Sequence, residues 1–247
     1  MAYVDGYLGP RVRWAFADRT DGVSLPPYDH GNLADHVGDD IDHVLTNRAA
    51  LAARVGVDGG HVVTMAPVHG NDVAQVAGPT EEPVAEVDAL VTTVPGLALL
   101  VLAADCVPVL LGDSGRGVVA VVHAGWRGVR SDVVGQTLAS MAELGASLDR
   151  VRAVVGPTIC GRCYDVPRER FDEVVAVAPE AASVAARGLP GLDLRAAVVA
   201  RLRDAGVTPQ LHGGCTAETP SLYSYRRDHV TGRHGGVITL LPETVPT

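Results

Sequence analysis

Lysine is absent from this chain of 247 residues, so all 20 of its basic residues are arginine. Without a lysine amine, the protein cannot form a Schiff base, use lysine as a general base, or hold a nucleotide phosphate with a P-loop lysine. An anionic ligand must instead be bound by arginine, backbone amides or a metal ion. The abundance of Ala, Val and Gly favours a GC-rich coding sequence as the origin of this bias.

Long hydrophobic runs are also missing. Asp105 interrupts the longest apolar stretch before it reaches the roughly 18 residues that would suggest a membrane span. The stretch Met1 to Pro10 lacks a basic start followed by an apolar segment, so no secretory signal is predicted. The net charge of -9 would repel the phosphates of nucleic acids. We therefore expect a soluble, cytoplasmic protein with no membrane and no nucleic-acid partner.

Cysteine is scarce as well. Four cysteines are too few to staple a chain of this length with disulfides, so reduced thiols are expected. Cys160 and Cys163 have the CxxC spacing, but no second CxxC pair accompanies them, which argues against a closed four-cysteine zinc site. A redox pair remains open as an interpretation of these two thiols.

The hydrophobic pattern predicts one domain, residues 1–247, with a sheet flanked by helices. Apolar runs with little alternation indicate strands buried on both faces. The predicted strands are residues 12–17, 62–68, 72–77, 89–93, 97–102, 107–111, 118–122, 151–155, 222–225 and 237–241. The predicted helices are residues 41–55, from after Trp126 to about Leu144, 167–177 and 193–205, with Asp40 and Asp193 as caps. The expected fold class is α/β to α+β, a layered sandwich of mixed β-sheet flanked by helices.

Asp113-Ser114-Gly115 superficially matches the nucleophile region of trypsin-like serine proteases. The segment joins two apolar runs and contains the residues that a tight hairpin needs. A protease of that class would be mostly β and would need a matching His and Asp framework. We therefore interpret the segment as a turn.

Residues that can bind a metal lie at the ends of predicted strands. His69 and His123 each end an apolar run, and Cys106 interrupts another. One thiolate and two imidazoles suit Zn²⁺, and three protein ligands leave a fourth position for water or substrate, as in catalytic zinc sites. Three separately buried core residues would give the same pattern, so the spacing alone leaves both interpretations open.

Linked motifs in a fixed order cover nearly the whole chain. They are Asn32-Leu33, His36-Val37-Gly38-Asp39-Asp40, Asn47-Arg48, Val68-His69-Gly70-Asn71-Asp72-Val73, Asp88-Ala89-Leu90-Val91-Thr92, Ala104-Asp105-Cys106-Val107-Pro108, His123-Ala124-Gly125-Trp126-Arg127-Gly128, Gly156-Pro157, Cys163-Tyr164-Asp165-Val166, Ser224-Tyr225-Arg226-Arg227 and Gly232-Arg233. With these motifs the chain resembles the bacterial laccase-domain purine nucleoside phosphorylase family, whose members were long labelled polyphenol oxidases. Two residues depart from the family pattern: Cys160 adds a second thiol near Cys163, and Asp165 stands where Glu is common.

The resemblance implies a zinc site made by His69, Cys106 and His123, and a fold like that of the cytotoxic-necrotizing-factor type of cysteine hydrolase. It implies phosphorolysis of adenosine, inosine, guanosine and S-methyl-5'-thioadenosine to the free base and ribose 1-phosphate or methylthioribose 1-phosphate. Adenosine deaminase activity is implied as well. The expected partners are therefore purine nucleosides and phosphate.

Charged and aromatic residues supply candidates for the remaining roles. Asp105 is a candidate proton carrier, but neighbours on a strand point to opposite faces, so it could equally anchor the backbone. Trp126 could stack on the base or ribose, or belong to the core. Phosphate held against C1′ of the ribose requires bidentate donors, for which the candidates are Arg48, Arg127, Arg226 and Arg227.

Three other functions compete with this hypothesis. A copper polyphenol oxidase would hold its cluster with His-X-His pairs, and none of the nine histidines lies two residues from another, which disfavours copper. A Cys-dependent amide hydrolase that edits peptidoglycan precursors would use Cys106 as nucleophile and His69 or His123 as base. The third alternative is a metal-binding module without catalysis.

Overall fold

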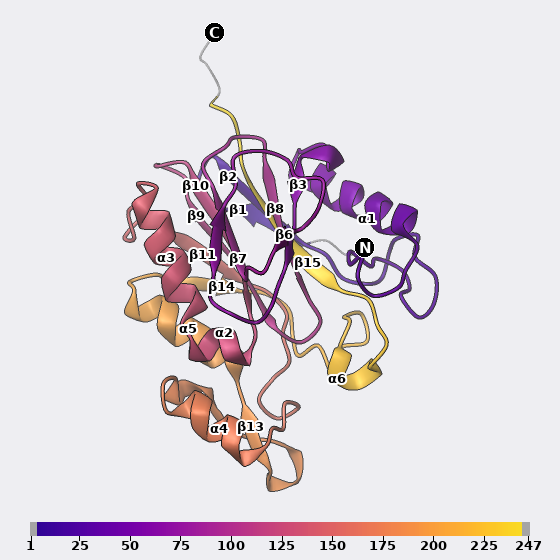
Figure 1. Ribbon diagram of the computed structural model, residues 1–247, viewed down its shortest axis with the longest axis vertical. Helices are drawn as coiled ribbons and strands as arrows, with labels where there is room; N and C mark the ends of the chain where they lie inside the picture. The colour runs from indigo at the N-terminus through magenta and orange to yellow at the C-terminus, as the bar shows by residue number, and fades with distance from the viewer. Residues whose placement is uncertain (1–3, 244–247) are drawn as a thin grey trace.

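The computed structural model describes residues 4–243, which form four layers (Figure 1). Two β-sheets face each other across a hydrophobic core, helix α1 packs on the outer face of one sheet, and helices α2, α3 and α5 pack on the outer face of the other. The predicted mixed sheet with flanking helices is confirmed. Residues 1–3, part of the stretch considered for a secretory signal, lie outside the described residues, as do residues 244–247.

The five-stranded sheet has the order β1-β2-β15-β8-β3 and is antiparallel except between β3 and β8. Its strands are β1 (Val4–Tyr7), β2 (Val12–Phe16), β15 (His234–Leu240), β8 (Ala98–Ala103) and β3 (Val62–Val63). The six-stranded sheet has the order β14-β11-β9-β10-β7-β5, with parallel pairs only at its two edges. Its strands are β14 (Pro209–Leu211), β11 (Arg152–Val155), β9 (Val107–Asp113), β10 (Val118–Ala124), β7 (Ala89–Thr92) and β5 (Val73–Gln75).

Two small sheets and the helices complete the fold. The small sheets pair β4 (Met65–Ala66) with β6 (Val84–Ala85), and β12 (Ala182–Val184) with β13 (Pro190–Leu192). The helices are α1 (Ile41–Arg54), α2 (Trp126–Arg130), α3 (Val133–Glu143), α4 (Arg168–Val175), α5 (Leu194–Asp204) and α6 (Tyr225–Asp228), with 3-10 turns at Gly59–His61, Pro179–Ala181 and Ala186–Gly188. No helix within residues 4–243 is both long and apolar enough to cross a membrane.

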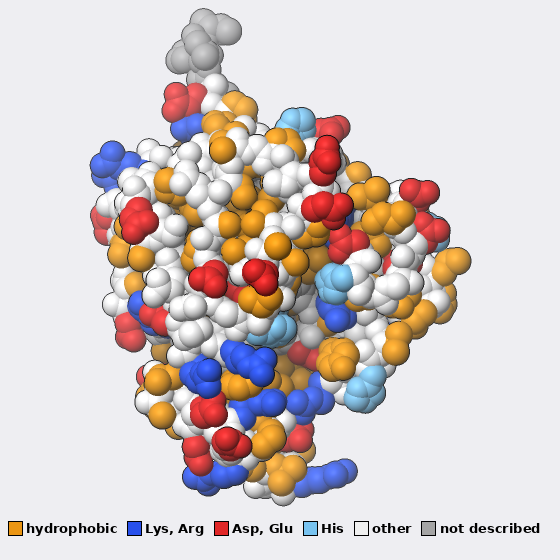
Figure 2. All heavy atoms as spheres, viewed as in Figure 1, with side chains coloured by type: hydrophobic (Ala, Val, Ile, Leu, Met, Phe, Trp, Pro, Cys, Tyr) orange, Lys and Arg blue, Asp and Glu red, His pale blue; other side chains and the backbone are white. Residues whose placement is uncertain are grey.

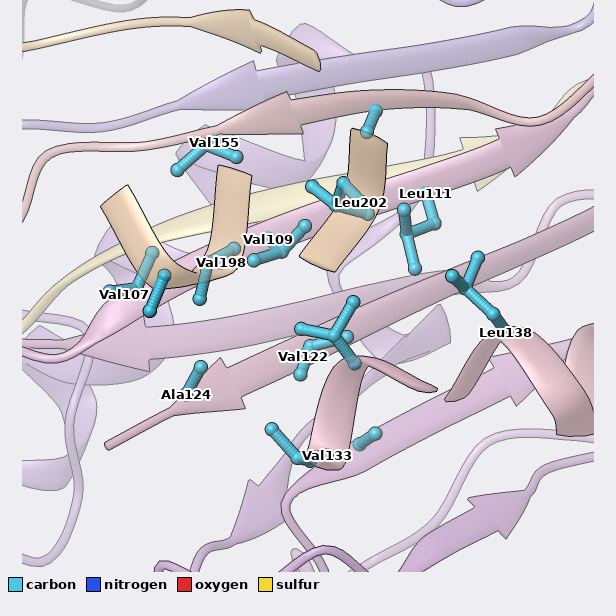
Figure 3. Close-up of a cluster of buried hydrophobic side chains, with 14 of the residues drawn as sticks. Val107, Val109, Leu111, Val122, Ala124, Val133, Leu138, Val155, Val198 and Leu202 are labelled. Atoms are coloured by element: carbon cyan, nitrogen blue, oxygen red, sulfur yellow. The ribbon is translucent and has the colours of Figure 1, made fainter. Parts of the chain in front are cut away.

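Strand β10 shows why the central strands lack alternation. The even-numbered residues of Val118–Ala124 pack with the helices, whereas Val119 and Val121 face the five-stranded sheet. Every residue of this strand is buried, as predicted for strands covered on both faces. In the helix-facing core, side chains of β9 and β10 lie beside Val198 and Leu202 of α5 (Figure 3).

Polar side chains set several element boundaries. The carboxylate of Asp40 accepts the N–H of Asp42 at the start of α1, and that of Asp193 accepts the N–H of Ala196 at the start of α5, so both predicted caps are confirmed. Asp113 also behaves as a turn residue: its carboxylate accepts the N–H groups of Gly115, Arg116 and Ser147. The interpretation of this segment as a turn between β9 and β10 is therefore confirmed.

Three element predictions were wrong in part or whole. The predicted helix after Trp126 is two helices, because Asp132 adopts a left-handed conformation with φ of 59° and caps α3 through the N–H of Gly135. The predicted strand at 62–68 is divided between β3 and β4. The predicted strand at 222–225 does not form: Ser224 instead accepts the N–H of Arg227 and caps α6.

Strand β15 begins with a fully buried histidine, which predicts a pH-dependent stability. Burial lowers the pKa of His234 to about 4. Between pH 6.5 and pH 4, this histidine is therefore protonated in the unfolded chain and neutral in the folded chain, which lowers the free energy of unfolding. Above pH 6.5 the histidine is neutral in both states and costs no stability in this way, and the loss of stability grows as the pH falls towards 4. Denaturant titrations at pH 7 and pH 4 should show that the wild type loses about 3 kcal/mol more than His234→Asn. Equal losses would contradict the prediction.

Candidate metal site

His69, Cys106 and His123 come together as predicted from the strand ends. Their ligand atoms lie within 4.8 Å of one another, and Cys106 Sγ is 3.8 Å from His69 Nε2. The two imidazole rings meet edge to face with centroids 4.8 Å apart. A tetrahedral zinc centre with bonds of about 2.3 Å to sulfur and 2.0 Å to nitrogen separates these ligands by about 3.5 Å. The donor set and its spacing therefore fit zinc.

Unusual backbone geometry positions the ligands. His69 has φ of 62°, and Asp105, immediately before Cys106, has φ of 101°. Non-glycine residues rarely adopt such angles, and where they occur they often mark functional sites. Gly125 lies against the same residues: a Cβ at this position would be 2.5 Å from His69 Cδ2. Only glycine allows the chain after β10 to pass so close to the ligands.

Asp88, immediately before β7, supports both histidines. Its completely buried carboxylate accepts the backbone N–H groups of Val68, His69 and Gly70, and lies 2.9 Å from His123 Nδ1. The backbone carbonyl of Asp88 also accepts the N–H of His123. A carboxylate on Nδ1 leaves Nε2 as the ligand atom and fixes the ring orientation. Burial would raise the pKa of Asp88, but the His123 ring and the amides lower it, which keeps the carboxylate ionised.

Cys106 is an acidic thiol. Burial alone would raise its pKa, but the imidazoles of His123 and His69 outweigh this effect and lower the pKa to about 6. Burial would likewise lower the pKa of His123, yet the thiolate of Cys106 and the carboxylate of Asp88 raise it to about 10. The thiolate needed by a metal or a nucleophile is therefore available at neutral pH.

The three ligands border a pocket of about 690 Å³. Its wall combines aromatic rings with guanidinium groups, contributed by Trp126, Tyr164, Tyr225, Arg127, Arg170, Arg226 and Arg233. Arg170 and Arg127 lie over the ring of Trp126, with Cζ 4.6 Å and 4.9 Å from the centroid, and Arg226 lies 5.0 Å from the centroid of Tyr164. Figure 2 shows basic side chains gathered on this face next to a histidine. The pocket can receive a ligand with a flat apolar part and a negative charge.

The family model described as multi-copper polyphenol oxidoreductase laccase matches residues 13–241. The chain belongs to this laccase-like family. A protein of Streptomyces coelicolor named purine nucleoside phosphorylase is 48% identical over 93% of this chain and 96% of its own. A protein of Mycobacterium tuberculosis with the same name is 44% identical over 94% of both chains.

Solved structures of similar proteins agree with the fold. YlmD from Geobacillus stearothermophilus superposes with a TM-score of 0.87 at 27% identity, covering 96% of this chain and 94% of its own. The Neisseria meningitidis protein NMB0706 superposes with a TM-score of 0.84 at 30% identity, covering 98% of this chain and 100% of its own. The resemblance to the laccase-domain family is thereby confirmed across nearly the whole chain.

Only some of the other predicted site residues of this laccase-like chain line the pocket. Trp126, Arg127 and Arg226 line the pocket. Arg48 does not: on α1 it donates to the carbonyl of Leu33 and pairs with Asp35, which does line the pocket. Arg48 thus supports a segment of the wall from behind.

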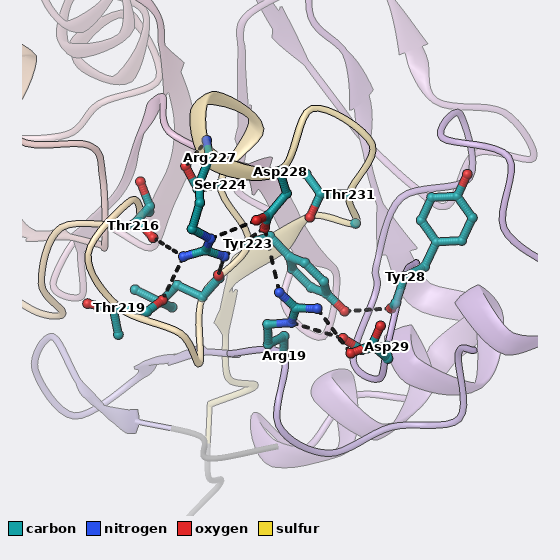
Figure 4. Close-up of polar contacts among 12 residues, drawn as sticks. Arg19, Tyr28, Asp29, Thr216, Thr219, Tyr223, Ser224, Arg227, Asp228 and Thr231 are labelled. Carbon is teal, nitrogen blue, oxygen red and sulfur yellow. Dashed lines mark hydrogen bonds and ion pairs between the residues drawn. The ribbon is translucent and has the colours of Figure 1, made fainter. Parts of the chain in front are cut away.

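Arg227 forms hydrogen bonds with the loop before α6. Its guanidinium donates to the carbonyls of Thr216, Thr219 and Leu222 and pairs with Asp228 (Figure 4). It is not among the residues that line the pocket. The geometry therefore favours a structural role for Arg227, whereas its neighbour Arg226 lines the pocket.

Asp105 lines the pocket, but its carboxylate already has three partners. It accepts the hydroxyls of Thr216 and Ser224 at 2.6 Å and 2.7 Å, and the N–H of Arg226 at 2.7 Å. This arrangement favours the anchoring role that the sequence left open beside proton transfer. It ties the Cys106 segment to the start of α6.

Sequence reasoning missed two pocket arginines and the role of Asp88. Arg170 lies on α4, far along the chain from the ligands, in a helix with no distinguishing motif. Arg233 was part of a motif, but nothing in its spacing indicated that it faces the pocket. Asp88 had the clearest signal, since a carboxylate directly before an apolar strand is a position where a partner for a ligand histidine can lie.

Proposed function

We propose that this chain is a zinc-dependent purine nucleoside phosphorylase that also deaminates adenosine. The substrates would be adenosine, inosine, guanosine and S-methyl-5'-thioadenosine, together with phosphate. The observation that carries the proposal is the position of His69, Cys106 and His123 on the wall of a pocket lined with aromatic rings and arginines. The relatives named purine nucleoside phosphorylase support it. Such an enzyme would act in the cytoplasm, on soluble nucleosides.

The pocket offers separate partners for the parts of the substrate. The rings of Trp126, Tyr164 and Tyr225 provide surfaces on which a purine can stack. Arg127 and Arg226 can bind phosphate through paired N–H donors, which places the nucleophile beside the ribose without a lysine. Holding both reactants in one pocket supplies the proximity that a two-substrate reaction needs.

Zinc would be held by the His69 and His123 imidazoles and the Cys106 thiolate. When bound, it would supply Lewis-acid chemistry and an activated water, which deamination requires. Asp88 orients His123 and keeps its Nδ1 protonated, so Nε2 faces the other ligands. Asp105 holds the segment before Cys106 against α6 and thereby fixes the distance between the ligands and Arg226.

The acidic thiol of Cys106 favours one second candidate, the Cys-dependent amide hydrolase. A thiolate beside two imidazoles is also the pairing that a cysteine nucleophile uses. The finer classification of the fold as the cytotoxic-necrotizing-factor type of cysteine hydrolase belongs to the same proposal. The two functions share the residues but differ in whether Cys106 binds the metal or attacks the substrate.

Incubation of the purified zinc-loaded protein with inosine and phosphate is expected to release hypoxanthine and ribose 1-phosphate. Release should depend on phosphate, because phosphorolysis and hydrolysis give different sugars. Chromatography of the base and an enzymatic assay for ribose 1-phosphate provide the two readouts. Failure to cleave any of the four nucleosides at full zinc occupancy would refute the proposal, and release of free ribose would indicate a hydrolase.

A further inference from the structure

A second cluster of potential metal ligands lies outside the candidate active site. The thiols of Cys160, Cys163 and Cys215 and a carboxylate oxygen of Glu218 all lie within 4.8 Å of one another. The three cysteines are free thiols. The sequence argument against a closed zinc site considered only CxxC pairs, and it could not foresee that the fold brings a third cysteine, 52 residues beyond Cys163, to the same place.

Local backbone bonds shape the cluster. The carbonyl of Cys160 accepts the N–H groups of Cys163 and Tyr164 at 3.0 Å, which folds the CxxC segment into a tight turn with its two thiols on one side. The N–H of Cys160 donates to Cys215 Sγ at 3.3 Å. This bond holds the sulfur of Cys215 against the CxxC turn. The segment that carries Cys215 and Glu218 is held beside the CxxC segment by the hydrogen bond from Thr216 N–H to the Thr158 carbonyl.

We propose that Cys160, Cys163, Cys215 and Glu218 form a second, structural zinc site. Four protein ligands close the coordination shell, in contrast to the three of the active-site cluster. A tetrahedral centre with Zn–S bonds of about 2.3 Å separates its sulfurs by about 3.8 Å, so shifts smaller than a bond length bring these ligands into place. Soft thiolates select zinc over the hard cations magnesium and calcium.

A disulfide accounts for less of the arrangement. It would join two of the thiols and leave the third, although all three sulfurs and the carboxylate of Glu218 lie within 4.8 Å of one another. Arg162 also faces the cluster and pairs with Glu218 at 3.0 Å, and the guanidinium of Arg195 bonds to the carbonyl of Gly156 nearby. These cations offset the negative charge that three thiolates and a carboxylate keep after binding one divalent ion.

The site would fasten together two segments that build the active-site pocket. Tyr164 and Asp165 follow the CxxC turn directly, and Arg226 lies beyond Glu218 in the other segment. These segments already meet where Arg226 pairs with Asp165 at 2.7 Å and lies over the ring of Tyr164. A zinc ion behind this contact would hold one wall of the pocket in place. Its loss should therefore lower thermal stability and weaken substrate binding more than it lowers kcat.

Metal analysis of protein purified under reducing conditions tests the proposal. The wild type should contain two equivalents of zinc per chain. Cys163→Ser and Cys215→Ser should each remove one equivalent, and His123→Ala should remove only the other, so the two sites are distinguished without an activity measurement. Glu218→Gln should weaken binding at the second site, whereas Glu180→Gln, at an exposed carboxylate elsewhere, should leave the zinc content unchanged.

Cobalt substitution gives an independent readout in the His123→Ala background. Cobalt should then produce a thiolate charge-transfer band and the intense visible bands of a tetrahedral site, and Cys215→Ser should reduce them. A single equivalent of zinc in the reduced wild type would overturn the proposal. So would two equivalents that persist in Cys215→Ser, or peptide mapping that finds Cys160 joined by a disulfide to Cys163 or Cys215 in the reduced, zinc-loaded protein.

Discussion

Replacing His123 with alanine is expected to remove one equivalent of zinc per chain and to lower phosphorolysis by more than about 100-fold. Loss of a partner that only orients a ligand costs up to about 100-fold in metal affinity or activity, and loss of the ligand itself should exceed that. The remaining ligands, His69 and Cys106, cannot hold the ion in the same geometry. Zinc content and the rate of base release from inosine, measured on the same sample, provide the check.

His61→Ala is the matched control, because His61 is an exposed histidine in a 3-10 turn away from the pocket. It should retain both zinc and activity. Cys106→Ser should behave like His123→Ala if the thiolate is a metal ligand. A Cys106→Ser protein that keeps its zinc but loses activity would contradict the metal role and favour the cysteine nucleophile.

Asp88→Asn is expected to weaken zinc binding at the same site by about 10- to 100-fold. An amide can replace only part of the carboxylate, which accepts three backbone N–H groups and bonds to His123 Nδ1. His123 would lose the negative partner that fixes its ring, and the His69 loop would lose part of its support. Competition with a chelator should measure the change in Kd, and excess zinc should restore most of kcat.

Asp72→Asn is the control for this variant, because Asp72 lies in the same loop but is exposed. It should bind zinc like the wild type. If Asp88 served only the fold, Asp88→Asn would lower the melting temperature of the metal-free protein and leave the Kd for zinc unchanged. That result would exclude a positioning role.

Part of the site was predictable because two of its ligands lie at the ends of buried strands. His123 ends the apolar run of β10, and Cys106 directly precedes β9, its neighbour in the same sheet. The strands themselves were predictable from continuous burial, which leaves a clear signal in the sequence. His69 shows the limit: it reaches the site through a left-handed residue after a two-residue strand, and no periodicity reveals that path.

The arginines show what sequence could not decide. Arg226 and Arg227 are adjacent and chemically identical, yet one faces the pocket and the other is enclosed by loop carbonyls. The difference arises because Ser224 starts a short helix where a strand was predicted, and a helix turns successive side chains by about 100°. The sequence offered both arginines as candidates for phosphate binding, and only the helix that follows the predicted strand at 222–225 distinguishes them.

The bonds between Asp88 and the loop of His69 have a consequence for evolution. The three donors are backbone amides, which every residue type except proline provides. Val68, half exposed beside the pocket, can therefore vary among relatives without disturbing the ligand next to it. The constraint at this position falls on the backbone and not on the side chain, with proline the one residue excluded.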